Sequence, residues 1–100
     1  MAYVVEVIPP KAGEAIFEVE EPTFEDACER ARRYRQRGYG AAISYATDRP
    51  RWWRVWSLGI DLPPMEMRCR SMGCAMAMAR RVSRDYVAAQ PIEVEEEVTA

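Results

Sequence analysis

Histidine is absent from the 100 residues of this chain, and leucine occurs only at Leu58 and Leu62. Without histidine the chain lacks the commonest general base and the commonest neutral metal ligand, which argues against hydrolytic enzymes and zinc enzymes. The sequence also contains no glycine-rich phosphate loop and no serine or cysteine with a visible base partner. These absences predict a protein that is not an enzyme and that uses no cofactor.

Long hydrophobic runs are missing too. No segment approaches the roughly 18 consecutive apolar residues of a membrane helix, and the N-terminus lacks the basic-then-apolar order of a signal peptide. The three cysteines therefore predict reduced thiols rather than a disulfide framework. A cytoplasmic protein with no membrane partner is the resulting expectation.

What the chain has instead is enough apolar volume for one core. Its 49% hydrophobic content comes largely from alanine, valine, methionine, tyrosine and tryptophan, and its formal net charge is only −2. A chain of this length and balance predicts a single folded domain over residues 1–100.

The clearest local element is a helix between a Thr23 cap and a Gly38 stop. Its apolar residues recur at helical spacing, which predicts one face packed on a sheet. Those residues are Phe24, Ala27, Cys28, Ala31 and Tyr34, with Cys28 expected to be inert packing. The acidic first turn and basic last turns suit the helix dipole, and the spacing predicts ion pairs from Asp26 to Arg30 and from Glu29 to Arg33.

Strands are predicted where residues alternate in polarity or are β-branched and aromatic. They cover residues 3–8, 14–20, 39–46, 51–58 and 92–98, with a short further strand or loop over 65–70. A second helix is expected from a Ser71 cap to about Ala89, with Val82 and Tyr86 on its core stripe. The order predicts an α+β fold with a ferredoxin-like antiparallel sheet, a βαββαβ core with an extra N-terminal strand, and both helices on one face.

The segment after the turn at residues 47–50 is rich in arginine and tryptophan. Trp53 and Val55 are expected in the core, and the remaining side chains are typical of a protein-binding surface. The predicted partner-binding residues are Arg49, Arg51, Trp52, Arg54 and Trp56. Together with the Arg30–Arg37 end of the first helix, the same residues could instead bind nucleic acid, with bases stacked on tryptophan.

The second helix carries no charge from Met72 to Ala79. Such a segment is either enclosed between two layers or exposed as a contact surface. The second alternative predicts a homodimer whose contact residues are Met72, Met76 and Met78.

Methionine and cysteine crowd residues 65–78, and thiolate and thioether ligands favour Cu(I). The order Met67-x-Cys69 followed by Cys74 resembles the Met-x-Cys-x-x-Cys loop of heavy-metal-associated domains, with four residues between the cysteines instead of two. That resemblance implies copper binding through Cys69 and Cys74. Plain core packing, with no metal, is the main expectation for these residues.

Taken together, these patterns predict a small module that acts by binding protein, as an inhibitor or adaptor of a larger complex. In general build it resembles small proteins encoded by phages and mobile elements. Nucleic-acid binding and soft-metal binding are the two alternatives.

Overall fold

The computed structural model describes residues 2–58 and 61–93 of the chain. These residues form six strands and two helices in the order that the sequence predicts, including the short strand over residues 65–69. The elements are β1 (Tyr3–Ile8), β2 (Phe17–Glu21), α1 (Phe24–Gln36), β3 (Gly40–Tyr45), β4 (Arg51–Ser57), β5 (Met65–Cys69), α2 (Met72–Arg80) and β6 (Tyr86–Ile92). The α+β class is therefore confirmed.

The strands divide between two antiparallel three-stranded sheets, so the single ferredoxin-like sheet is not confirmed. Sheet A has the order β2-β1-β3, and sheet B has the order β5-β4-β6. Strand β1, predicted as an accessory to the βαββαβ core, is the central strand of sheet A and pairs with β2 and β3. Its apolar sequence is suited to that position because both faces of a central strand can be buried.

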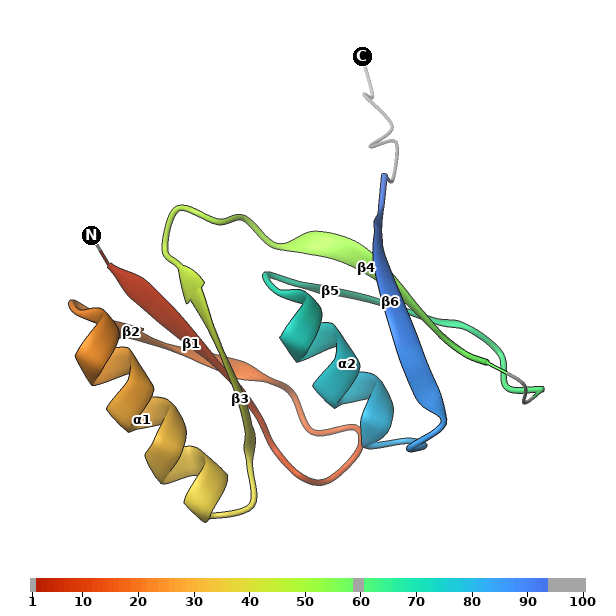
Figure 1. Cartoon of the computed structure of the whole chain (residues 1–100), viewed down its shortest axis with the longest axis horizontal. Helices are drawn as coiled ribbons and strands as arrows, with labels where there is room; N and C mark the ends of the chain where they lie inside the picture. Colours follow the sequence, from red (N-terminus) through yellow and green to blue (C-terminus); the bar gives the residue numbers. More distant parts are fainter. Residues whose placement is uncertain (1, 59–60, 94–100) are drawn as a thin grey trace.

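The helices lie on opposite faces of sheet A rather than on one face. Helix α1 packs on β1, β2 and β3, whereas α2 contacts β1 and β3 of sheet A and all three strands of sheet B. The layers therefore run α1, sheet A, α2, sheet B, and Figure 1 shows α2 between the two sheets. This position explains why α2 is apolar on every side.

Helix α1 begins as its sequence predicts, since the Asp26 amide donates to the Thr23 hydroxyl over 3.1 Å. Gly38 follows the helix with a φ of 88°, the left-handed conformation that a glycine stop provides. Arg33 pairs with Glu29 as predicted, but Arg30 pairs with Glu21 of β2 instead of with Asp26. Tertiary contact has replaced the local pair there.

The predicted buried stripe of α1 is only partly buried. Ala27 and Ala31 are fully enclosed against sheet A, while Cys28 is exposed and Phe24 keeps 54% of its surface. Because sheet A is narrow, the outer residues of the stripe extend past the covered area. The prediction that Cys28 is core packing is wrong.

Helix α2 begins at the predicted Ser71 cap, whose hydroxyl accepts a hydrogen bond from the Cys74 amide over 3.1 Å. It ends at Arg80, nine residues before the predicted end at Ala89, because the amides of Val82 and Ser83 bond back to the Ala79 carbonyl and close the helix with a turn. Val82 is 61% exposed, contrary to its expected place in the core.

Tyr86, expected on the same helix stripe as Val82, is buried as the first residue of β6. The final strand was predicted over residues 92–98. Residues 94–98 lie outside the described part of the chain, and the observed strand covers Tyr86–Ile92.

Small residues let α2 approach β3 closely. A Cβ atom added at Gly40 would lie 3.3 Å from the Cβ of Ile8 and 3.5 Å from the Cβ of Ala77, whereas one added at Gly73 would lie 3.6 Å from the Cβ of Ala42. The 3.3 Å distance at Gly40 is shorter than an ordinary van der Waals contact, whereas the 3.6 Å distance at Gly73 is ordinary. The tight contact at Gly40 is with Ile8, its partner on β1, whereas the contact with Ala77 of α2 is ordinary. Gly40 therefore leaves room for the Ile8 side chain under α2.

Replacing Gly40 with valine is expected to lower the free energy of unfolding by about 1–3 kcal/mol, because two extra methyl groups must enter the packed layer between β3 and α2. Urea denaturation of the purified variant measures this. The matched control is Gly73→Ala, which is expected to raise stability by up to about 1 kcal/mol through helix propensity. A stabilised Gly40→Val protein would contradict the close packing, since valine favours strands wherever space allows.

Candidate functional site

One face of sheet B turns away from α2. Along β4 the side chains alternate, so that Trp53 and Val55 are buried toward α2 while Trp52, Arg54 and Trp56 point the other way. Within the described residues, no helix or strand packs on that second side, because β4 contacts only β5, β6 and α2. We call this side the outer face of sheet B.

Neighbouring strands add both apolar and charged groups to the outer face of sheet B. Trp52 lies between Arg68 of β5 and Ile92 of β6, and Trp56 lies opposite Ala88 of β6. Trp52 keeps 39% of its surface exposed, and Trp56 is half-buried. The face is thus a row of two indoles with aliphatic neighbours.

Charge on this face is partly neutralised. Arg54 pairs with Glu66 across the strands over 2.8 Å, and both side chains stay about half exposed. Arg68 is exposed, and the described residues provide no ion pair for it. An exposed guanidinium with no ion pair in the described part of the chain, beside an exposed indole, is suited to a carboxylate or carbonyl on another molecule.

The prediction that Trp53 lies in the core is confirmed. Its indole Nε1 donates to the Cys69 carbonyl over 3.0 Å. The structure does not bring all five predicted partner-binding residues together. Arg51 has the same strand parity as Trp53, and with Arg49 it lines a separate depression of about 200 Å³. Only Trp52, Arg54 and Trp56 share the outer face of sheet B.

The three methionines predicted as a dimer contact lie at different depths. Met76 and Met78 are half-buried and pack against the core between the two sheets. Met72, in the first turn of α2, is 54% exposed. Enclosure between two layers thus accounts for the uncharged turns of α2, and homodimerisation stays a prediction in which Met72 is the accessible residue.

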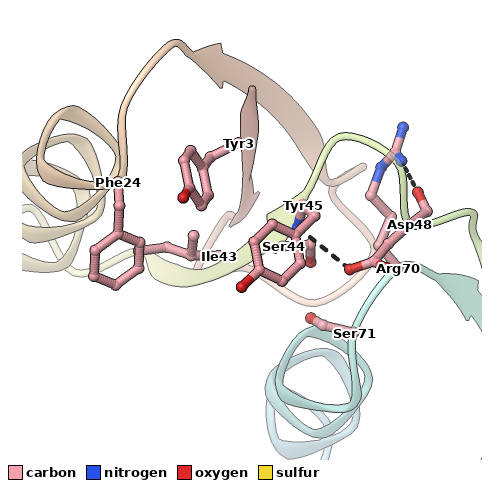
Figure 2. Close-up of a pocket in the computed structure, with 8 residues that line it drawn as sticks. All are labelled: Tyr3, Phe24, Ile43, Ser44, Tyr45, Asp48, Arg70 and Ser71. Atoms are coloured by element: carbon pink, nitrogen blue, oxygen red, sulfur yellow. Dashed lines mark hydrogen bonds between the residues drawn. The ribbon is translucent and has the colours of Figure 1, made fainter. Parts of the chain in front are cut away.

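An aromatic depression that the sequence did not predict lies where sheet A meets the start of α2 (Figure 2). Its volume is about 250 Å³. The ring centroid of Tyr3 lies 5.6 Å from that of Phe24 and 5.5 Å from that of Tyr45. The lining residues are Tyr3, Phe24, Ile43, Ser44, Tyr45, Asp48, Arg70 and Ser71.

Arg70, on one side of that depression, is occupied by neighbouring groups. Its guanidinium pairs with Glu18 over 2.9 Å. The same group donates to the Asp48 carbonyl, and Figure 2 shows Arg70 beside Asp48. The hydrogen bond to Glu18 is the main cause of the raised pKa of Arg70. Because its donors are used in this way, the arginine holds the linker and β2 together rather than offering itself to a ligand.

A buried polar cluster lies at the N-terminal end of α2. Glu6 is fully buried although it stands in the apolar run of β1. Its carboxylate accepts hydrogen bonds from the Arg70 amide over 2.8 Å, the Ser71 hydroxyl over 2.8 Å and the Ser44 hydroxyl over 3.4 Å. A carboxylate inside a strand of valines was the sequence signal for this cluster, and sequence reasoning missed it.

The predicted metal-ligand residues meet in the same place. A carboxylate oxygen of Glu6 and the sulfurs of Cys69 and Cys74 all lie within 4.8 Å of one another, and all three residues are buried. The Cys74 sulfur also lies 4.0 Å from the Met78 sulfur. The pKa of the Cys74 thiol is raised, first by its hydrogen bond with Cys69 and then by burial. The structure therefore joins two cysteines separated by four residues with a carboxylate from another sheet.

Comparison with known proteins gives no family for this chain. No family model matches it, and neither the curated proteins nor the solved structures contain a match. Among the described residues, no helix has the length and apolar character needed to span a membrane.

Alkylation of the folded protein is expected to modify Cys28 quickly and Cys69 and Cys74 only after unfolding, because Cys28 is exposed and the other two thiols are buried. Mass spectrometry of protein treated with iodoacetamide, with and without denaturant, counts the modified thiols. A Cys28→Ser variant should show almost no labelling in the folded state. Rapid labelling of that variant would contradict the enclosed position of Cys69 and Cys74.

Proposed function

We propose that this chain is a small, non-enzymatic protein-binding module whose partner binds the outer face of sheet B. The observation that carries the proposal is the alignment of Trp52, Arg54 and Trp56 on a sheet face that no described element covers. Exposed tryptophan beside arginine is the combination in which binding energy concentrates at protein interfaces. Both indoles lie on strands of a rigid sheet, so little conformational entropy is lost when a partner binds.

The side chains on the outer face of sheet B indicate the chemical character of the partner. Two indoles and Ile92 favour an apolar segment, and Arg68, which has no ion pair within the described residues, favours a carboxylate near the edge of that segment. The Arg54 pair with Glu66 supplies both a donor and an acceptor close to the middle of the face. We therefore infer an acidic and apolar protein surface, and action as an inhibitor or adaptor that occupies such a surface on a larger cytoplasmic complex.

Nucleic acid is the less favoured partner. The arginines at the end of α1 do not extend the tryptophan face, because α1 contacts sheet A alone. Arg30, Arg32 and Arg33 are already paired with glutamates. Glu66 pairs with Arg54 on the outer face, which reduces the positive charge that a phosphate backbone would need there. These positions favour a protein partner over a single-stranded nucleic acid.

Replacing Trp52 and Trp56 together with alanine is expected to reduce binding of the natural partner by at least about 100-fold, because two hot-spot side chains are removed. The melting temperature should change by only a few degrees because both indoles are partly exposed. Affinity capture from a host lysate, with a photo-crosslinking residue at position 90 opposite Arg54, identifies the partner. Titration of that purified partner gives the affinity of each variant.

The matched control is Phe24→Ala, which removes another exposed aromatic ring, on α1, far from sheet B in the layer order. It should bind as the unchanged protein does. Equal loss of binding in both variants would contradict docking on the outer face. A loss of 1000-fold or more between about 50 and 200 mM salt, with nucleic acid in the captured material, would instead support the nucleic-acid alternative.

A further inference from the structure

The cluster around Glu6 joins sheet A, α2 and sheet B. Glu6 belongs to β1 in sheet A, Cys69 ends β5 in sheet B, and Cys74 lies in the first turns of α2. All three side chains are buried, with exposed fractions of 0%, 3% and 0%. A ligand held by the three residues would therefore link both sheets to the helix between them.

Glu6 is provided with hydrogen bonds but with no ion pair. Two hydroxyls and one backbone amide donate to its oxygens, and the salt bridges within the described residues do not include it. Burying a carboxylate costs free energy unless charge or hydrogen bonds compensate it. A cation held by the cluster would place a positive charge directly beside the Glu6 carboxylate. Because both thiols lose their protons on binding, a divalent ion leaves the net charge of the site at that of the carboxylate alone.

The distances are close to those of a metal site. Zinc lies about 2.3 Å from a thiolate sulfur, so two sulfurs on one tetrahedral ion are about 3.8 Å apart. In the structure the three ligand atoms lie within 4.8 Å of one another. Side-chain movements of about 1 Å or less would therefore bring them onto one ion. A thioether also lies close to these ligand atoms, since the Met78 sulfur is 4.0 Å from the Cys74 sulfur.

We propose that Glu6, Cys69 and Cys74 supply three ligands of a binding site for a thiophilic d¹⁰ cation, Zn(II) or Cu(I), that clamps the two sheets onto α2. The site lies beneath the surface, so it suits an ion that is held during the life of the protein rather than one that is passed to a partner. This inference does not depend on the binding function of sheet B. On binding, the two thiols lose their protons to solvent, and the ion then bonds to the sulfurs.

The chemical types of the ligands also distinguish Zn(II) from Cu(I). The Glu6 oxygen favours Zn(II), which accepts carboxylate with thiolate, whereas the Met78 thioether favours Cu(I). A Met78→Leu variant keeps the volume of the side chain and removes its sulfur. This change should leave Zn(II) affinity unaltered and should weaken Cu(I) affinity if the thioether is a ligand.

The test uses the full chain, freed of metal by a chelator under anaerobic reducing conditions and shown by circular dichroism to be folded. Zn(II), Cu(I) and Co(II) are titrated separately against a competing chelator. One equivalent of at least one d¹⁰ ion should bind, with a melting temperature that rises with ion concentration. Co(II) should give the sulfur-to-metal charge-transfer absorption of thiolate ligation.

Cys69→Ser and Cys74→Ser are expected to lower metal affinity by at least about 100-fold, since loss of a direct ligand exceeds the 10- to 100-fold effect of an outer-shell residue. Cys28→Ser is the matched control and should bind as the unchanged chain does, because Cys28 is outside the cluster. Retention of one tightly bound ion by the double variant of Cys69 and Cys74 would overturn the proposal.

If the serine variants do not fold, metal titration of the unchanged protein tests the proposal instead. Absence of the Co(II)–thiolate absorption and of any one-to-one binding in the folded, reduced chain would overturn the proposal. A Cys69–Cys74 disulfide in freshly prepared anaerobic protein, detected as a loss of two hydrogens in its mass, would also overturn it.

Discussion

Helix α2 must be covered on both sides, and the rest of the structure depends on that requirement. Its turns from Met72 to Ala79 have no charged residue that could face water, so an apolar layer is needed above and below. Sheet A meets the helix through glycine and alanine, whereas sheet B meets it through larger side chains such as Trp53 and Met67. Ile8 of sheet A also belongs to this core, so both sheets bury large side chains against the helix.

Enclosing α2 has two consequences for the surfaces described above. At the N-terminal end of the helix, the Ser71 hydroxyl and the Arg70 amide donate to the buried carboxylate of Glu6 on β1. Sheet B, in contrast, has only one side covered by α2, which leaves Trp52 and Trp56 on the other. A buried polar cluster and an open aromatic face thus result from the same arrangement of layers. The first links β1 to the start of α2 by hydrogen bonds, and the second is the surface on which we propose that a partner binds.

Local signals in the sequence predicted local structure well. Thr23 and Ser71 cap their helices because a capping hydroxyl acts within three residues, and the alternation along β4 placed Trp53 and Trp56 on opposite faces. Pairing between strands could not be predicted in this way. The assignment of β1 to the centre of sheet A depends on contacts with residues 40–45, and helical spacing at Val82 and Tyr86 imitated a longer α2. The meeting of Glu6 with Cys69 and Cys74 likewise depends on partners more than 60 residues away in the chain.

Each sheet is built from one continuous segment of the chain. Helix α2 belongs to the second segment but packs against both sheets. Residues 3–45 supply sheet A with α1, and residues 51–92 supply sheet B with α2. During synthesis the first half leaves the ribosome before the helix that covers its second face. Ile8, Ala42 and the carboxylate of Glu6 therefore stay in contact with water until α2 arrives. The first half therefore completes its packing only with the second, and we expect the whole chain to unfold in a single cooperative transition.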